Sequence, residues 1–451
     1  MEAEQQENFP LPKDSILSYT KNIFTPIRMG ECVTAVWVAL SGRRLVTKFV
    51  IENLHLLKAV VPEYEEYLNV YIEPLDLTES SLEGYLRLIG KSVIAACNKN
   101  EISLRDIRGE SFDNEDLSYQ KLLTLLTDLI GEITIRSKKV VLFLGELDEL
   151  TFIDNTFSNN LESLLHKFEE KLYFVFLIKD LNLLHDRGNF GEDLYENFLQ
   201  NIIYMPISDK HSDYLIDRFA SRLNTNFTDG EKNLLKSTSD GHPYFLKVAC
   251  SLLVKVKSLG ESADFSELIR SNHELRAAAK MILGVQTKKG LEILKKVTSG
   301  VVKELEGDDA KILEKLGLVK KNIDGSYSPF CDLFKDTILE RSLPEIEERP
   351  LNGEGLVYNQ DENVLLFKGV PTEEKFTPQE YQILTAFLKE PNKLMSRENV
   401  GNILWGKDSY DKYSDWAIDQ LISKLRRKLQ KLGVTGTNLI TLRGRGYKII
   451  V

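Results

Sequence analysis

Between residues 30 and 207, the chain alternates short, nearly continuous apolar runs with longer amphipathic stretches. Five runs have the length of a β-strand: CVTAVWVAL, LNVYIEPL, KVVLFLGEL, YFVFLIKDL and NIIYMPI. Helical stretches such as LEGYLRLIGKSVIAAC and LSYQKLLTLLTDLIGEI lie between them. Strands that are apolar on both sides need a cover on both faces of their sheet, and the intervening helices can supply it. The pattern therefore predicts an α/β fold with a parallel sheet, whose functional residues lie at the carboxyl ends of the strands.

Three further segments give this region a resemblance to the ATPase core of STAND-type and AAA+ proteins. The first strand runs into SGRRLVTKF, at the position of a phosphate-binding loop. SDGHPYFLKVACSLL is similar to the start of the STAND lid, and LEKLGLVKKNIDGSYSPFCDLFKDTIL is similar to the small winged helix that follows that lid. The resemblance implies an ATPase-like α/β domain over residues 1–207, a helical lid over 208–282 and a small winged helix over 283–345.

The loop lacks the residues that phosphate chemistry requires. A working loop needs glycines that expose backbone N–H groups, a lysine for the β- and γ-phosphates, and a hydroxyl for Mg²⁺. With Gly42 as the first glycine, Thr47 takes the place of the second, Lys48 takes the lysine position and Phe49 replaces the hydroxyl. Shifting the register by one or two residues recovers Thr47 as the hydroxyl but loses the lysine. We therefore expect a degenerate phosphate loop.

The acidic strand end that should hold Mg²⁺ is altered as well. In KKVVLFLGELDEL, Gly145 stands where an Asp is expected, and only Glu146 remains of the acidic pair. We therefore expect an ATPase fold that does not hydrolyse nucleotide and that has no catalytic residues, no metal and no resident cofactor. Binding of ATP or ADP through Arg43, Arg44 and Lys48 is one alternative, and a solvated basic turn is the other.

His242 offers two similar alternatives. The resemblance to STAND proteins implies that this histidine faces the nucleotide. The second interpretation is that it caps the helix that begins at Pro243.

The carboxyl-terminal segment from Gln420 to Val451 contains eight Lys or Arg residues and no Asp or Glu, in a protein of net charge -10. The stretch QLISKLRRKLQKLG predicts an amphipathic helix. Its apolar face contains Ile418, Ile422, Leu425 and Leu429, and its polar face contains Gln420, Ser423, Lys424, Arg427 and Lys431. The stretch NLITLRGRGYKIIV predicts a hairpin with two arginines at its turn. A solvated charged face is the alternative for the helix alone, but the adjoining hairpin favours a surface that contacts duplex DNA.

Residues 355–451 as a whole resemble the OmpR/PhoB-type winged-helix DNA-binding domain. GLVYNQDENVLLFKGVPTEEKF fits the family's opening four-stranded sheet, FTPQEY its first helix start, SRENVGNILWG its second helix, and ISKLRRKL with TLRGRGY its recognition helix and wing. The resemblance implies a recognition helix in the major groove and a wing at the adjacent minor groove. It assigns DNA contacts to Ser423, Lys424, Arg426, Arg427, Thr441, Arg443 and Arg445. Leu421 departs from the family, which often has a polar residue there.

Charge divides the chain in the same way. From Pro350 to Val451 there are 15 Lys and Arg against 12 Asp and Glu, while the remainder has 43 against 56. Opposite signs are expected when a DNA reader is joined to a regulatory body. No run of about 18 apolar residues and no basic-then-apolar leader is present, which argues against a membrane span or secretion. Four scattered cysteines fit buried thiols in a reducing cytoplasm.

The two resemblances together imply a cytoplasmic, sequence-specific DNA-binding transcriptional regulator with an inactive STAND/AAA+-like body. Its partner would be double-stranded DNA, bound as a homodimer because a single winged helix makes few base contacts. One alternative is a signal-transduction ATPase whose nucleotide turnover switches DNA binding. Another is an interaction scaffold in which the winged helix contacts proteins.

Overall fold

The computed structural model divides the chain into two compact units, Met1–Ser342 (unit 1) and Leu343–Val451 (unit 2). Each unit is described by itself. The structure describes residues 9–342 except 78, 80, 106–111, 115, 137, 151–154, 186–191, 260–263, 301 and 303, and residues 356–450 except 360–363, 368–369, 372–375, 390–392, 406–414, 432–437 and 443–445.

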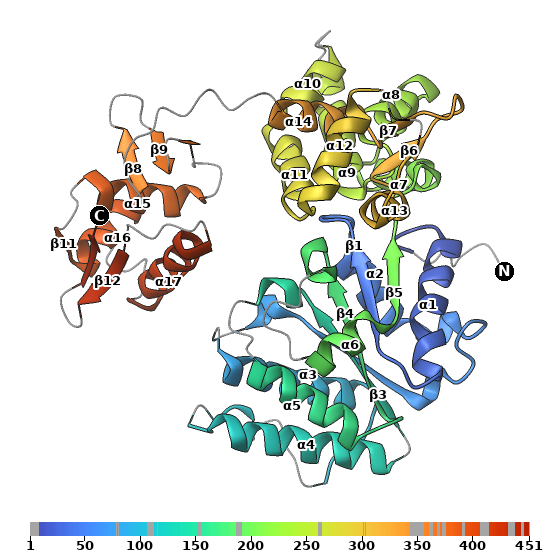
Figure 1. Ribbon diagram of the computed structural model, residues 1–451, viewed down its shortest axis with the longest axis vertical. Helices are drawn as coiled ribbons and strands as arrows, with labels where there is room; N and C mark the ends of the chain where they lie inside the picture. The colour runs from blue at the N-terminus through green and yellow to red at the C-terminus, as the bar shows by residue number, and fades with distance from the viewer. Residues whose placement is uncertain are drawn as a thin grey trace. The chain divides into compact units, whose positions relative to one another are not determined.

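A five-stranded parallel sheet forms the centre of unit 1, as the five apolar runs predict (Figure 1). The strand order is β2-β3-β4-β1-β5. The strands are β1 (Val33–Trp37), β2 (Tyr67–Ile72), β3 (Lys139–Gly145), β4 (Leu172–Ile178) and β5 (Ile202–Met205). Every residue of β1 and β4 is buried, whereas the edge strands β2 and β5 alternate or are half-buried. Central strands of a sheet that is covered on both faces have this burial pattern.

Helices cover both faces of this sheet because the chain crosses it in two directions. The connection from β1 to β2 runs one way along the sheet and the later connections run back, so right-handed crossovers place their helices on opposite faces. One layer contains α1 (Lys13–Arg28) and α2 (Arg43–Glu52). The other contains α3 (Leu82–Lys99), α4 (Tyr119–Ile135), α5 (Asn155–Lys167) and α6 (Glu192–Gln200).

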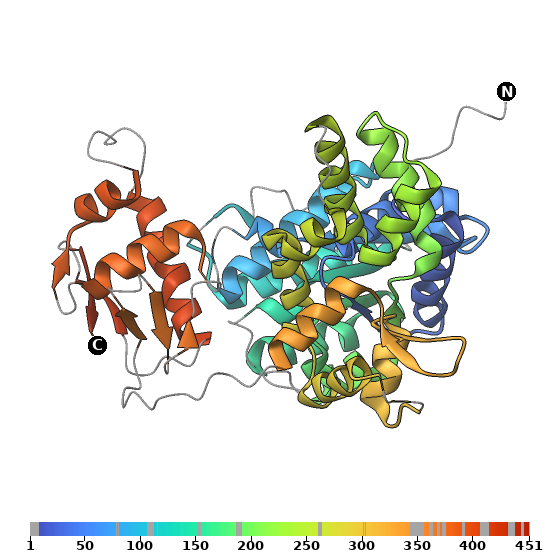
Figure 2. The ribbon, with the colours of Figure 1, turned by 90° about the horizontal axis from the view of Figure 1, so that it is seen from above.

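A helical segment lies beyond the carboxyl ends of the strands (Figures 1 and 2). It contains α7 (Ser212–Arg222), α8 (Asp229–Ser239), α9 (Pro243–Leu259), α10 (Phe265–Ser271) and α11 (His273–Gly284). A helix pair, a short antiparallel hairpin and a last helix follow: α12 (Lys288–Thr298), α13 (Asp308–Lys315), β6 (Val319–Lys321), β7 (Tyr327–Pro329) and α14 (Asp332–Ser342). These elements agree with the expected lid and small winged helix. The boundaries proposed within unit 1 stay a prediction, and one at 282/283 would cut α11.

Unit 2 combines two small antiparallel sheets with three helices. The first sheet has the order β10-β9-β8, and the second has the order β11-β13-β12. The elements are β8 (Leu356–Asn359), β9 (Val364–Phe367), β10 (Val370–Pro371), α15 (Pro378–Lys389), β11 (Leu394–Met395), α16 (Arg397–Trp405), α17 (Asp415–Lys431), β12 (Asn438–Leu442) and β13 (Gly446–Ile450). The opening sheet has three strands among the described residues, one fewer than the resemblance implied. The short strand β11 was not expected, because two residues are too few to form a sequence pattern.

Candidate nucleic-acid interface and degenerate phosphate loop

The predicted basic helix is α17, which begins at Asp415, before the first residue of the predicted stretch. Its expected apolar face is confirmed, because Ile418, Ile422, Leu425 and Leu429 are buried in the core of unit 2. Leu421 is half-buried and packs against the same core. The packing of Leu421 against this core explains why an apolar residue stands where the family often has a polar one.

The polar face of α17 presents side chains of graded exposure. Lys424 is exposed and has no ion-pair partner among the residues that the structure describes, whereas Gln420, Ser423 and Arg427 are half-buried. The Arg427 Nε lies 3.5 Å from the carbonyl oxygen of Ser423, one turn earlier. Lys431 is the last residue of the helix, and its side chain lies outside the described part. Among the side chains that the structure describes, the face therefore offers the Lys424 ammonium group and several hydrogen-bonding groups to a ligand.

Two basic residues of α17 are engaged within the unit. The Nε of Arg426 donates to the carbonyl oxygen of Leu439 at 2.5 Å, which ties the helix to strand β12. Lys428 forms an ion pair with Glu380 of α15 and lies over the Phe376 ring at 5.9 Å from its centroid. Lys428 therefore anchors the helix, and Arg426 has a structural task besides the DNA contact predicted for it.

Glu380 also completes a reciprocal cap at the start of α15. Its carboxylate accepts the Thr377 backbone N–H at 2.8 Å, and its own N–H donates to the Thr377 hydroxyl at 3.3 Å. Burial alone would raise the pKa of Glu380, but the Lys428 ammonium and the Thr377 donors hold that pKa below its ordinary value. The anionic form is therefore the one that the fold stabilises.

The predicted wing is the hairpin of β12 and β13, in which Thr441 pairs with Tyr447 and Leu442 pairs with Gly446. Arg443 and Arg445 lie outside the described residues, as does the side chain of Thr441. Gly446 has φ 125°, and a Cβ at this position would lie 2.2 Å from the Met395 carbonyl oxygen of β11. Only glycine fits where the hairpin meets β11 so closely.

In unit 1, α2 begins at Arg43, directly after Gly42, whose φ of 92° is left-handed. A phosphate loop joins a strand to a helix and ends at its second glycine. The structure therefore makes Gly42 the second glycine and not the first, which corrects the predicted register. Arg43 then stands in the lysine position, Arg44 in the hydroxyl position, and the buried Trp37 in place of the first glycine. Sequence alone missed this register because no first glycine marks it.

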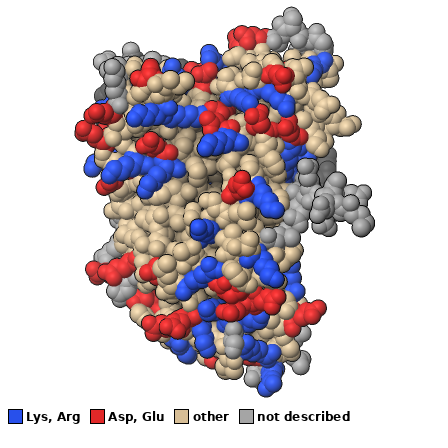
Figure 3. Space-filling view, turned by 90° about the vertical axis from the view of Figure 1, so that its right-hand side faces the viewer, with Lys and Arg blue, Asp and Glu red and all other residues tan. Residues whose placement is uncertain are grey.

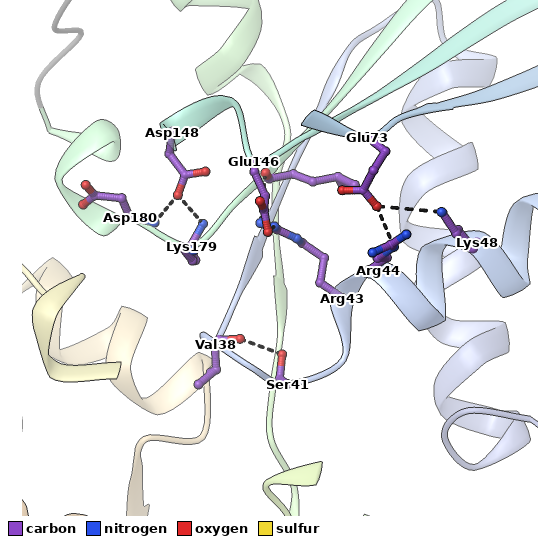
Figure 4. A network of polar contacts seen from close by, with 11 residues as sticks. Val38, Ser41, Arg43, Arg44, Lys48, Glu73, Glu146, Asp148, Lys179 and Asp180 are labelled. Carbon is purple, nitrogen blue, oxygen red and sulfur yellow. Dashed lines mark hydrogen bonds and ion pairs between the residues drawn. The ribbon is translucent and has the colours of Figure 1, made fainter. Parts of the chain in front are cut away.

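The basic residues of this loop are paired with carboxylates at the ends of neighbouring strands (Figure 4). The Arg43 Nη2 lies 2.6 Å from Glu146 Oε1, just after β3, and its Nη1 donates to the Leu177 carbonyl oxygen at 3.3 Å. The Arg44 Nε lies 2.6 Å from Glu73 Oε2, just after β2. The Lys48 Nζ lies 3.7 Å from the same oxygen. The predicted cations are thus brought together, and two carboxylates of the protein balance two of their three charges.

These residues do not fit a Mg²⁺-nucleotide complex. Gly145 occupies the metal-carboxylate position, and a Cβ there would lie 2.9 Å from the Ile72 carbonyl oxygen and 3.0 Å from the Tyr71 hydroxyl. Asp148 is turned to β4, where its Oδ2 accepts the Lys179 and Asp180 backbone N–H groups at 3.1 and 3.0 Å.

Thr47 offers no replacement ligand either. Its side chain is fully buried in α2, with its hydroxyl 3.4 Å from that of Tyr19. Neither ligand that Mg²⁺ would need is therefore available. The Thr47 hydroxyl is buried against Tyr19, and the position of Gly145 has no room for a carboxylate side chain.

His242 is completely buried and joins α9 to the phosphate loop. Its Nε2 lies 3.0 Å from the Ala39 carbonyl oxygen, and its Nδ1 lies 3.4 Å from the Phe245 backbone nitrogen. Because the Phe245 N–H must donate, Nδ1 accepts and the proton lies on Nε2, which donates to Ala39. Burial lowers the pKa of His242 to about 4. The histidine therefore caps α9, as the second interpretation held.

Charges on the face of the molecule drawn in Figure 3 are mixed. Lys and Arg side chains lie interspersed with Asp and Glu and do not gather into a field of one sign. Among the described residues, no cluster of three His, Cys, Asp or Glu is arranged to hold a metal ion. None of the described helices combines the length and apolarity that crossing a bilayer requires.

The small sheets, three helices and carboxyl-terminal hairpin of unit 2 define a winged-helix module of the nucleic-acid-binding class. Residues 372–449 match the family described as "Transcriptional regulatory protein, C terminal". This part of the chain is therefore an OmpR/PhoB-type winged-helix domain, and the resemblance predicted from its sequence is confirmed.

Curated transcriptional regulatory proteins match part of the chain. The uncharacterized transcriptional regulatory protein YvcP of Bacillus subtilis is 31% identical over 140 residues, which are 31% of this chain and 52% of the relative. The phosphate regulon transcriptional regulatory protein PhoB of Shigella flexneri is 29% identical over 111 residues, 25% of this chain and 46% of the relative. The chain thus spans about half the length of these curated relatives. A solved Walker-type ATPase of Pyrococcus abyssi aligns with 71% of this chain and 95% of its own at 13% identity, with a TM-score of 0.43.

Proposed function

We propose that this protein is a sequence-specific DNA-binding transcriptional regulator, in which unit 2 reads the duplex and unit 1 is a regulatory body without ATPase activity. The observation that carries the proposal is the OmpR/PhoB-type domain with a basic helix seated on its core. The exposed Lys424 and the half-buried Ser423 and Arg427 lie on the polar face, where they can contact phosphates and base edges.

Two finer points belong to the same proposal. A single winged helix contacts few bases, so useful affinity requires two half-sites and a dimer on DNA. Because the proposed ligand is promoter DNA, we propose a cytoplasmic location for the protein.

The signal-transduction ATPase is the second candidate, and the ion pairs of the loop argue against it. Turnover requires a hydroxyl and a carboxylate for Mg²⁺. In unit 1 these positions hold Arg44 and a glycine without room for a side chain. A scaffold that uses unit 2 for protein contacts makes a different prediction, namely binding that depends little on salt.

The experiment is selection of bound duplexes from a random library with the full-length protein, followed by affinity measurements across a salt series. Lys424→Glu should weaken binding about tenfold or more at 0.1 M salt, and it should flatten the salt dependence by about one unit of slope. Lys289→Glu is the matched control, because Lys289 is also exposed on a helix and has no ion-pair partner among the described residues, but it belongs to α12 of unit 1. Equal losses in the two variants, or no enriched sequence in the wild type, would contradict the proposal.

A further inference from the structure

The first two turns of α2 gather three cations at the carboxyl edge of the sheet. Arg43, Arg44 and Lys48 all lie within the space of six residues, after a left-handed glycine. The amino-terminus of a helix adds its own positive potential there. In a nucleotide-binding protein, phosphate groups would balance such charges.

In this protein, two carboxylates balance two of the three charges. Glu73 follows β2, is only 4% exposed as a side chain, and faces both Arg44 and Lys48. Glu146 follows β3 and pairs with Arg43, whose side chain is 10% exposed. Burying a carboxylate is unfavourable unless cations compensate it, so these pairs are mutually dependent.

We infer that Glu73 and Glu146 are built-in ligands that stand in for the phosphates of a nucleotide, so that the loop is complete without one. Gly145 fits this arrangement, because the space beside it is filled by Tyr71 and the end of β2, where a metal-binding carboxylate would need to lie. The His242 bond to Ala39 connects the same loop to α9. The carboxylates thus hold α2 at the strand ends, in the place where a nucleotide would otherwise have to balance its charges.

The inference predicts a gain of binding, which general damage to the protein cannot mimic. The wild type should not bind mant-labelled ADP at millimolar concentration, with or without Mg²⁺. The double variant Glu73→Gln, Glu146→Gln keeps the side-chain shapes but releases the three cations. It should bind mant-ADP at least about tenfold more tightly than the wild type, and equally well in EDTA, because no metal ligand has been restored.

The matched control is the double variant Glu52→Gln, Glu63→Gln, which also removes two ion-paired carboxylates from unit 1. Their partners are Lys99 and Arg28, neither of which belongs to the loop. This control should behave as the wild type does. If the loop variant does not fold, Glu73→Gln alone frees Arg44 and Lys48 and should show the same metal-independent gain.

Three results would overturn the inference. These are mant-ADP binding by the wild type at millimolar concentration, with or without Mg²⁺, a folded loop variant that gains no mant-ADP binding, and an equal gain in the control. None of them bears on DNA binding by unit 2, so that part of the proposed function would stand or fall separately. Mg²⁺-dependent nucleotide binding by the wild type would also count against the proposed lack of ATPase activity in unit 1.

Discussion

The Glu380–Lys428 pair makes a quantitative prediction about how the recognition helix is held. Glu380→Gln keeps the size of the side chain. The amide oxygen of the glutamine can still accept the Thr377 N–H, whose nitrogen lies 2.8 Å from the carboxylate oxygen in the wild type. The variant loses the ionic attraction to Lys428 and the favourable charge at the amino-terminus of α15. The Lys428 side chain is 35% exposed, so water screens the ion pair. We therefore assign the pair a contribution of about 1 kcal/mol to the free energy of unfolding. The helix-terminus charge adds roughly 0.5 kcal/mol, for a total loss of about 1–2 kcal/mol.

Hydrogen exchange of the full-length protein measures this loss locally. Amides of α15 and α17 should exchange about tenfold faster in Glu380→Gln at pH 7, while amides of the sheet in unit 1 should not change. Lys428→Met should have a similar effect. The double variant should cost less than the sum of the two single variants, because each single change already removes the pair.

The pH dependence provides an internal check. The pKa of Glu380 is lowered in the folded protein, so its contribution is present above the ordinary value of 4.5 and is lost as pH falls through the lowered value. The wild type and Glu380→Gln should therefore converge in stability as the pH falls from 4.5 through the lowered pKa of Glu380. Strictly additive single and double variants, or a difference that persists in acid, would refute the reasoning.

Three further predictions concern single positions. Gly446→Ala should destabilise unit 2 by at least about 2 kcal/mol, because its Cβ meets the Met395 carbonyl oxygen and its φ is positive; wild-type urea stability would disprove this. Leu425→Ala should cost about 2–5 kcal/mol by opening a cavity under α17, and a smaller loss would mean that the helix is not seated on this core. His242 is neutral when buried, so unit 1 should lose roughly 1.4 kcal/mol of stability per pH unit between pH 6.5 and about 4. His242→Gln should remove that slope, and a slope retained in this variant would assign it to other groups.

The sequence alone determined the elements whose signal is local and periodic. Five apolar runs gave five parallel strands, since strands that are buried on both faces require apolar side chains at every position. The apolar stripe of α17, the Thr377 cap and the hairpin around residues 443–445 were predictable for the same reason, because helix period, capping and turn chemistry act between neighbours in the chain.

Only the tertiary structure decided which charges are free. Lys424 and Lys428 are one turn apart and look alike in the sequence, but Lys428 meets Glu380, which lies 48 residues earlier. The register of the phosphate loop was settled in the same way, by the position where α2 begins and by Glu73 and Glu146 arriving from other strands. Ion pairs between distant segments have no periodic signature in the sequence. They depend on which strands and helices become neighbours in the fold, and the sequence pattern does not specify that order.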